Sequence, residues 1–114
     1  FRKERQEMNE QKLIRVLALF REYEADIPVG CIMAFLYLMN NPGATVSQVI
    51  HDLGFTKQSA SRNMRNLTHR ARPEKEGINV CRTEPDDNDY RIHRWFLNQR
   101  GEELKAKIQA IFDG

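Results

Sequence analysis

Apolar residues recur at helical spacing near both ends of the chain, among charged residues. Their spacing of three and four positions over residues 4–24, and again over residues 99–112, predicts two amphipathic helices. Two such stripes exceed what a domain of this size needs to cover its own core, so we expect residues 1–25 and 99–114 to be dimerisation helices of a homodimer. The residues expected in that interface are Leu13, Val16, Leu17, Phe20, Leu104, Ile108, Ile111 and Phe112.

A denser apolar run, from Cys31 to Met39, predicts a central helix that is largely buried. Asp26 can cap this helix and Pro28 suits its first turn. The segment Asn40-Asn41-Pro42-Gly43 predicts its end, because proline removes a hydrogen-bond donor and glycine tolerates conformations that a helix cannot use.

Two short helices separated by a glycine turn come next. Thr45 and Gln48 have the spacing of a capping box, and the apolar face that follows them ends at Gly54. Thr56 can cap a further helix that continues to about Ala71. Phe55 is expected to anchor the turn in the core, and the inward positions of the second helix are Ala60, Met64 and Leu67. Residues 45–71 therefore predict a helix-turn-helix.

A loop and two short strands are predicted after the helix-turn-helix. Arg72–Gly77 is a loop by its proline, glycine and charge content. Asn79–Glu84 and Arg91–Leu97 contain β-branched and aromatic residues typical of strands, and Pro85–Tyr90 between them has the composition of a turn. A hairpin in this place, over residues 78–97, is a wing. We therefore expect one domain over residues 1–114, mainly α with a small β-hairpin: a winged helix-turn-helix flanked by terminal dimerisation helices.

Length and composition fit a small single domain. The chain has 114 residues, and no apolar run approaches the roughly 20 residues that cross a bilayer. The charged start lacks the apolar core of a signal peptide, so we expect a soluble, cytoplasmic protein without membrane contact. Cys31 and Cys81, the two cysteines, are expected to be buried small hydrophobes, with redox sensing as the alternative.

Positive charge gathers on the second helix of the predicted helix-turn-helix, although the net charge is only +2. No acidic residue occurs between Leu53 and Pro73, and the outward positions recur at helical spacing as Gln58, Arg62, Arg65 and His69. Arginine can pair with guanine, and glutamine with adenine, which makes this a candidate recognition helix for the major groove of double-stranded DNA. The plainer alternative is a solvated helix face.

The candidate DNA-binding residues lie on both helices and on the segment that follows them. Ser47 and Gln48 stand near a helix N-terminus, where backbone N–H groups can hold a phosphate. The others are Thr56, Lys57, Gln58, Ser59, Ser61, Arg62, Arg65, Asn66, His69, Arg70 and Arg72.

The wing carries a more specific signature. Asp89-Tyr90-Arg91 is followed by Trp95, Leu97 and Gly101, and this spacing resembles the MarR family of dimeric winged-helix transcription regulators. Ser59–Leu67 also looks like the fourth helix of that family, and the resemblance covers most of the chain. It implies that Arg91 enters the minor groove and that Asp89 braces it. It also implies a dimeric regulator of transcription, with room for a small-molecule effector of unknown identity.

Several positions depart from the family pattern. Ten positions separate Leu67 from Gly77, where the family reaches this glycine within a few residues. Glu84-Pro85 replaces the usual Asp-Pro, Asn98 replaces a threonine that caps the last helix, and the C-terminal helix is short. These changes are typical of a divergent or reduced member.

Other functional classes have weaker support. Asp86, Asp87 and Asp89 faintly suggest a calcium loop but lack its glycine and distal glutamate, and the histidines have no metal-ligand spacing. Trp95 is expected in the core rather than against a ligand. We expect no catalytic site, metal or cofactor, and hence no enzyme. The rival hypothesis is a winged-helix protein-interaction module, an assembly adaptor or antagonist that binds no DNA.

Overall fold

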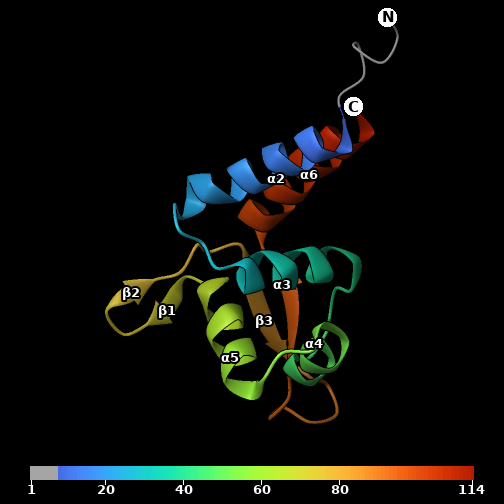
Figure 1. The fold of residues 1–114 in the computed structure, drawn as a ribbon. Coiled ribbons are helices and arrows are strands. Elements are labelled where there is room, and N and C mark those ends of the chain that lie inside the picture. Colours follow the sequence, from blue (N-terminus) through green and yellow to red (C-terminus); the bar gives the residue numbers. More distant parts are fainter. Residues whose placement is uncertain (1–7) are drawn as a thin grey trace, which may run out of the picture.

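The computed structural model describes residues 8–114, so residues 4–7 of the first expected helix lie outside this part of the chain. The elements are α2 (Asn9–Tyr23), α3 (Val29–Asn40), α4 (Val46–Leu53), α5 (Lys57–Asn66), β1 (Arg70–Arg72), β2 (Lys75–Glu76), β3 (Cys81–Pro85), β4 (His93–Leu97) and α6 (Gln99–Asp113). Figure 1 shows α2 beside α6 at one end of the molecule and α4, α5 and the β3–β4 hairpin at the other. The predicted winged helix-turn-helix is confirmed, but residues 8–114 contain a second hairpin, β1–β2.

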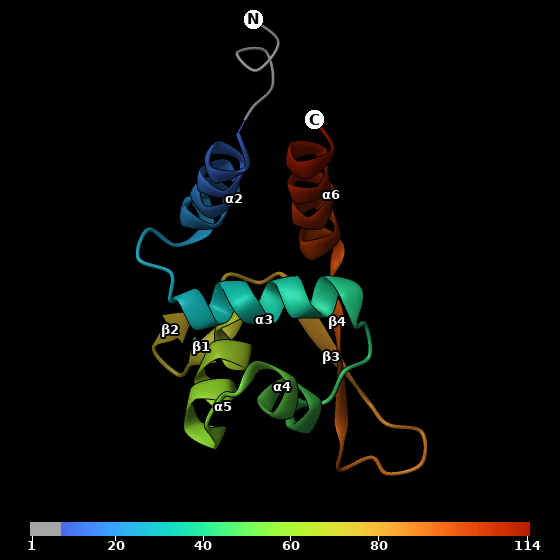
Figure 2. The ribbon, with the colours of Figure 1, turned by 45° about the vertical axis from the view of Figure 1, so that its right-hand side comes forward.

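Helix α3 crosses between the two ends of the molecule and runs through the core (Figure 2). The rings of Phe20 and Phe35 pack edge to face with their centroids 5.6 Å apart, which joins α2 to α3. The cap expected at Asp26 is wrong. Pro28, whose fixed φ of −63° and extended ψ of 143° suit the N-cap, precedes the first helical residue, and Asp26 is exposed two residues earlier.

The helix-turn-helix forms as its local signals predict. Thr45 and Gln48 make the capping box, with the Thr45 N–H donating to Gln48 Oε1 at 2.8 Å and the Gln48 N–H donating to Thr45 Oγ1 at 3.2 Å. Gly54 ends α4 in the left-handed conformation, with φ of 71°. The Thr56 hydroxyl caps α5 by accepting from the Ser59 N–H. Phe55 packs against the core, and the three inward positions of α5 are buried.

Helix α5 ends at Asn66, about five residues before the predicted end near Ala71. In a longer helix, the carbonyls of residues 66–68 would accept from the amides of residues 70–72. Here the Asn66 carbonyl accepts from Ile78, the Leu67 carbonyl from Val80 and Cys81, and the Thr68 carbonyl from Asn79, at 2.8 to 3.1 Å. The returning chain therefore takes the acceptors that the helix would need.

The chain between these bonded ends folds back as the β1–β2 hairpin. Arg70 pairs with Glu76 and Arg72 with Lys75, with an irregularity between the two pairs. The expected loop over residues 72–77 and the end of the expected helix are thus replaced by two antiparallel strands. Gly77 closes the hairpin, and a Cβ atom there would lie 2.0 Å from the Thr68 carbonyl oxygen.

The wing is the β3–β4 hairpin, with pairs from Cys81–Leu97 to Pro85–His93. Strand β3 starts two residues later than predicted, after Asn79, whose φ of 58° is incompatible with a strand. Trp95 is buried, as expected, and its backbone forms a bridge to Ala44. This bridge ties the wing to the segment that leads into α4.

Two residues at the start of α6, Asn98 and Gly101, have structural roles there. The Asn98 side chain caps α6 by accepting from the Gly101 N–H at 2.9 Å. A Cβ atom at Gly101 would lie 2.0 Å from the Val80 carbonyl oxygen, so glycine allows α6 to approach the start of the wing.

The apolar stripes of α2 and α6 are buried in the chain's own core to a greater extent than expected. The buried residues of the predicted dimer set are Val16, Phe20, Leu104, Ile108 and Ile111. These five side chains are covered within one chain and are not available to a partner in this conformation. Leu17 is half-buried against the core, whereas Leu13 and Phe112 are each 50% exposed.

Candidate nucleic-acid interface

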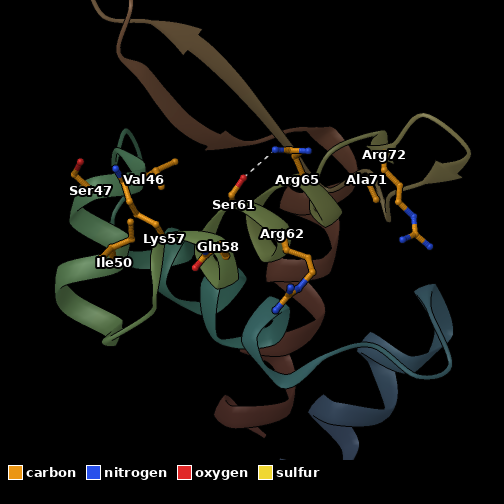
Figure 3. Close-up of a pocket in the computed structure, with 10 residues that line it drawn as sticks. All are labelled: Val46, Ser47, Ile50, Lys57, Gln58, Ser61, Arg62, Arg65, Ala71 and Arg72. Carbon is orange, nitrogen blue, oxygen red and sulfur yellow. Dashed lines mark hydrogen bonds between the residues drawn. The ribbon is translucent and has the colours of Figure 1, made fainter.

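The outward face of α5 forms the floor of an open surface hollow of about 660 Å³. Figure 3 shows Val46, Ser47 and Ile50 of α4 on one side of this face and Ala71 and Arg72 of the β1–β2 hairpin on the other. The α5 residues that line the hollow are Lys57, Gln58, Ser61, Arg62 and Arg65. The structure thus brings together seven of the fifteen residues predicted to contact DNA.

Several polar groups on this face remain unpaired. Arg65 donates to the Ser61 hydroxyl at 3.0 Å, as drawn in Figure 3. Within residues 8–114, the side chains of Lys57, Gln58 and Arg62 make no hydrogen bond or ion pair. Unpaired arginine and amide groups on one exposed helix face can meet phosphates and base edges without first breaking internal bonds.

Three candidate residues are less available for contact with DNA than expected, because they are buried or already bonded. Asn66 is 5% exposed, and its Nδ2 donates to Glu24 Oε1 at 2.8 Å, so its side chain is buried and bonded within the chain, and its contact with DNA stays a prediction. Ser59 is half-buried and accepts from Asn63. The Gln48 side chain is exposed, but its Oε1 is occupied by the capping box.

His69 and Arg70 lie outside the helix on which they were predicted, and Arg72 lies on a strand instead of in the predicted loop. His69 is exposed after the last turn of α5, and Arg70 and Arg72 belong to β1. The predicted helical series Gln58, Arg62, Arg65, His69 therefore stops at Arg65, because the helix stops at Asn66.

The wing tip holds an arginine in a defined orientation. Arg91 Nε and Nη2 each donate to the Asp89 carboxylate at 3.0 Å, one to each oxygen, and the Arg91 backbone N–H donates to the same group. These bonds lower the pKa of Asp89 and raise the pKa of Arg91. Arg91 remains 80% exposed, so the fork is braced without being covered.

A second carboxylate organises the loop that joins β3 to β4, and the sequence alone did not reveal this role. Asp86 accepts from Arg94 Nε at 2.6 Å and from the backbone N–H groups of Asn88 and Asp89. Arg94 also donates to the Gly43 carbonyl at 2.9 Å. Asp86 and Asp89, two of the three aspartates that faintly suggested a calcium loop, thus each accept hydrogen bonds from an arginine. The only available sequence signal is the aspartate's place at the start of a turn, where it commonly accepts from the backbone.

Residues 8–114 contain no group of three or more histidine, cysteine or acidic side chains placed to hold a metal ion. None of the helices described is both long and apolar enough to span a membrane. Cys31 and Cys81 are free and buried, as expected. Burial raises the pKa of both thiols, that of Cys81 to about 12, which disfavours the reactive thiolate.

The protein has counterparts among solved structures, although no protein-family model and no curated protein sequence matches it. A MarR transcriptional regulator from Methanosarcina mazei Go1 superposes with a TM-score of 0.67 and 19% identity, covering 88% of this chain and 65% of that one. Another MarR family regulator gives a TM-score of 0.62 and 25% identity, covering 86% and 62%. Streptococcus pneumoniae FabT, solved in complex with DNA, gives 0.62 and 21%, covering 93% and 74%.

The chain has the fold of the MarR-family transcription regulators. It spans slightly less than two thirds of the length of the first two regulators. The spacing between Leu67 and Gly77 is longer than in the MarR pattern, and the β1–β2 hairpin occupies it.

Glu24, at the end of α2, connects this hairpin to α5. Its two carboxylate oxygens accept from Asn66 Nδ2 at 2.8 Å and from Lys75 Nζ at 3.0 Å. These bonds outweigh the desolvation of the carboxyl group, and they lower its pKa below the ordinary value of 4.5. One carboxylate thus joins three elements that are distant in the sequence.

The lowered pKa predicts how Glu24→Gln responds to pH. A depressed pKa contributes stability above the unfolded-state value of 4.5, and this contribution is lost as the pH falls through the folded-state pKa. We expect the variant to be less stable than the wild type by about 1 kcal/mol at pH 7, and the difference to shrink below pH 4.5. Urea unfolding of both proteins between pH 7 and pH 3 measures it. A stability difference that stays constant with pH would show that the charge of Glu24 does not stabilise the fold.

Proposed function

We propose that the protein is a MarR-like transcription regulator that binds double-stranded DNA as a homodimer, with α5 in the major groove and the wing in the minor groove. The observation that carries this proposal is the exposed, acid-free face of α5, whose Arg62, Lys57 and Gln58 make no hydrogen bond or ion pair within residues 8–114, flanked by a wing that presents Arg91. FabT, which shares the fold, is solved in complex with DNA, and this supports the same partner here. Such a regulator would act in the cytoplasm.

Selection of binding sites from random duplex DNA tests the proposal. A dimer with two recognition helices about 34 Å apart should enrich an inverted repeat with half-sites one helical turn apart. The rival protein-interaction module predicts no enrichment and no binding of any duplex at low salt. Binding without an enriched sequence would support a DNA-binding protein but not a sequence-specific regulator.

Arg62 is expected to read bases, because it is exposed on the outward face of α5 and has no bonded partner in the described part of the chain. Arg62→Ala should cost about 1–3 kcal/mol on the selected site and less on unrelated duplexes, the result for an arginine bidentate to guanine. Fluorescence anisotropy with both duplexes measures the two losses. Equal losses on all sequences would assign Arg62 to a phosphate instead.

Arg91 is expected to enter a minor groove, since Asp89 holds its exposed fork in place. Arg91→Ala should weaken binding most at sites with A·T-rich flanks and make the salt slope of log K shallower by about 0.9. Arg91→Lys should restore only part of the affinity, because lysine keeps the charge but loses the planar fork. Unchanged affinity and slope in a folded Arg91→Ala variant would mean that the wing does not touch DNA.

The dimer is expected to use the apolar side chains that the chain leaves exposed on its terminal helices. Leu13, Ile14 and Phe112 are 50%, 64% and 50% exposed. Leu13→Glu with Phe112→Glu should yield a folded monomer, because the change puts charge into the proposed interface without touching the core. Light scattering measures the mass, and Val29→Glu, an exposed apolar position on α3, is the matched control. A wild-type chain that is monomeric at every concentration would contradict the dimer.

A further inference from the structure

The β1–β2 hairpin stands beside the face of α5 that is proposed to enter DNA. Figures 1 and 2 both show the hairpin next to α5, and β1 is the strand that packs against this helix. Ala71 is half-buried, whereas Arg72 is exposed and lines the same hollow as Gln58 and Arg62. The hairpin therefore extends the recognition surface on the side opposite α4, as seen in Figure 3.

The hairpin is held firmly at its base. The Gly77 N–H donates to the His69 carbonyl at 3.2 Å, and the Thr68 hydroxyl donates to the Arg65 carbonyl at 2.7 Å. On the other strand, the ion pair between Lys75 and Glu24 ties the hairpin to the end of α2. Side chains on β1 are thus presented at a fixed position relative to α5.

Charge is distributed unequally over the two strands. Strand β1 carries Arg70 and Arg72 and no acidic residue, while Glu74 and Glu76 lie on the turn and on β2. In the described part of the chain, neither arginine side chain donates a hydrogen bond or joins an ion pair. The strand nearest the recognition helix is therefore the basic one, and the acidic side chains occupy the turn and the strand farther from it.

We propose that β1 is a second DNA contact, in which Arg70 and Arg72 bind backbone phosphates of the duplex that receives α5. The inference rests on the proposed function. A helix about 10–12 Å across fills a major groove about 12 Å wide, so an element directly beside the helix meets the phosphate ridge rather than base edges. Phosphate contacts fix the position of a protein on DNA and carry no sequence information directly.

The test compares salt dependence with sequence preference. Binding of the selected duplex and of a scrambled duplex of equal length is measured by anisotropy over a range of salt for Arg70→Ala/Arg72→Ala. We expect weaker binding to both duplexes by the same factor, and a salt slope of log K shallower by about 0.9 for each phosphate that is no longer neutralised. Arg70→Lys/Arg72→Lys should keep most of the slope, because a phosphate accepts a point charge.

A matched variant controls for net charge. Lys107 is exposed on α6, an element at the other end of the fold from α4 and α5, and Lys107→Ala removes one charge as Arg72→Ala does. Only Arg72→Ala should change the slope. Melting curves check that each variant is folded, which is expected because both arginines are exposed.

The possible outcomes separate the hairpin from the function as a whole. A wild-type protein that binds DNA, with slopes unchanged in the folded arginine variants, would overturn the hairpin contact and leave the function standing. A loss confined to the selected duplex would assign these arginines to base reading and overturn the phosphate contact. Failure of the wild type to bind any duplex at low salt would overturn the proposed function and the hairpin contact together.

Discussion

The carbonyl groups at the end of α5 determine how the three candidate DNA-binding elements are placed. Those of residues 66–68 accept from the amides of residues 78–81 instead of continuing the helix. The exchange fixes the length of α5, sets the start of the wing and leaves the chain between them to form the β1–β2 hairpin. Because buried backbone groups must be paired, lengthening α5 would leave the amides of residues 78–81 without these partners.

The arginines of the candidate interface are in two different states. On the wing, Arg91 and Arg94 are each bound to an aspartate, whereas Arg62 on α5 and Arg72 on β1 make no such bond within residues 8–114. An exposed ion pair contributes little to stability, so the bond between Arg91 and Asp89 acts mainly by restricting the orientation of the fork. A narrow groove requires such orientation, while a wide groove or a phosphate ridge can be met by a more mobile side chain.

Local signals predicted the helix-turn-helix well. Thr45, Gly54 and Thr56 act through bonds to residues within four positions, and the structure has all three as predicted. The end of α5 was missed because it depends on amides more than ten positions away, and because arginine and alanine are good helix formers. The burial of Asn66 was missed for a related reason, since its partner Glu24 lies 42 positions earlier. The stripes of α2 and α6 show where amphipathic faces lie but not whether they are covered by the same chain.

The base of the hairpin also explains how a MarR-like fold accommodates the ten positions between Leu67 and Gly77, which exceed the spacing of the family pattern. Leu67 and Val80 are joined by a backbone hydrogen bond of 2.8 Å, so the two ends of the extra segment are adjacent. Extending a surface segment whose ends are already together costs little loop-closure entropy and need not move the elements on either side. The residues of this segment can therefore add a basic strand beside α5 without changing how α5 and the wing are positioned.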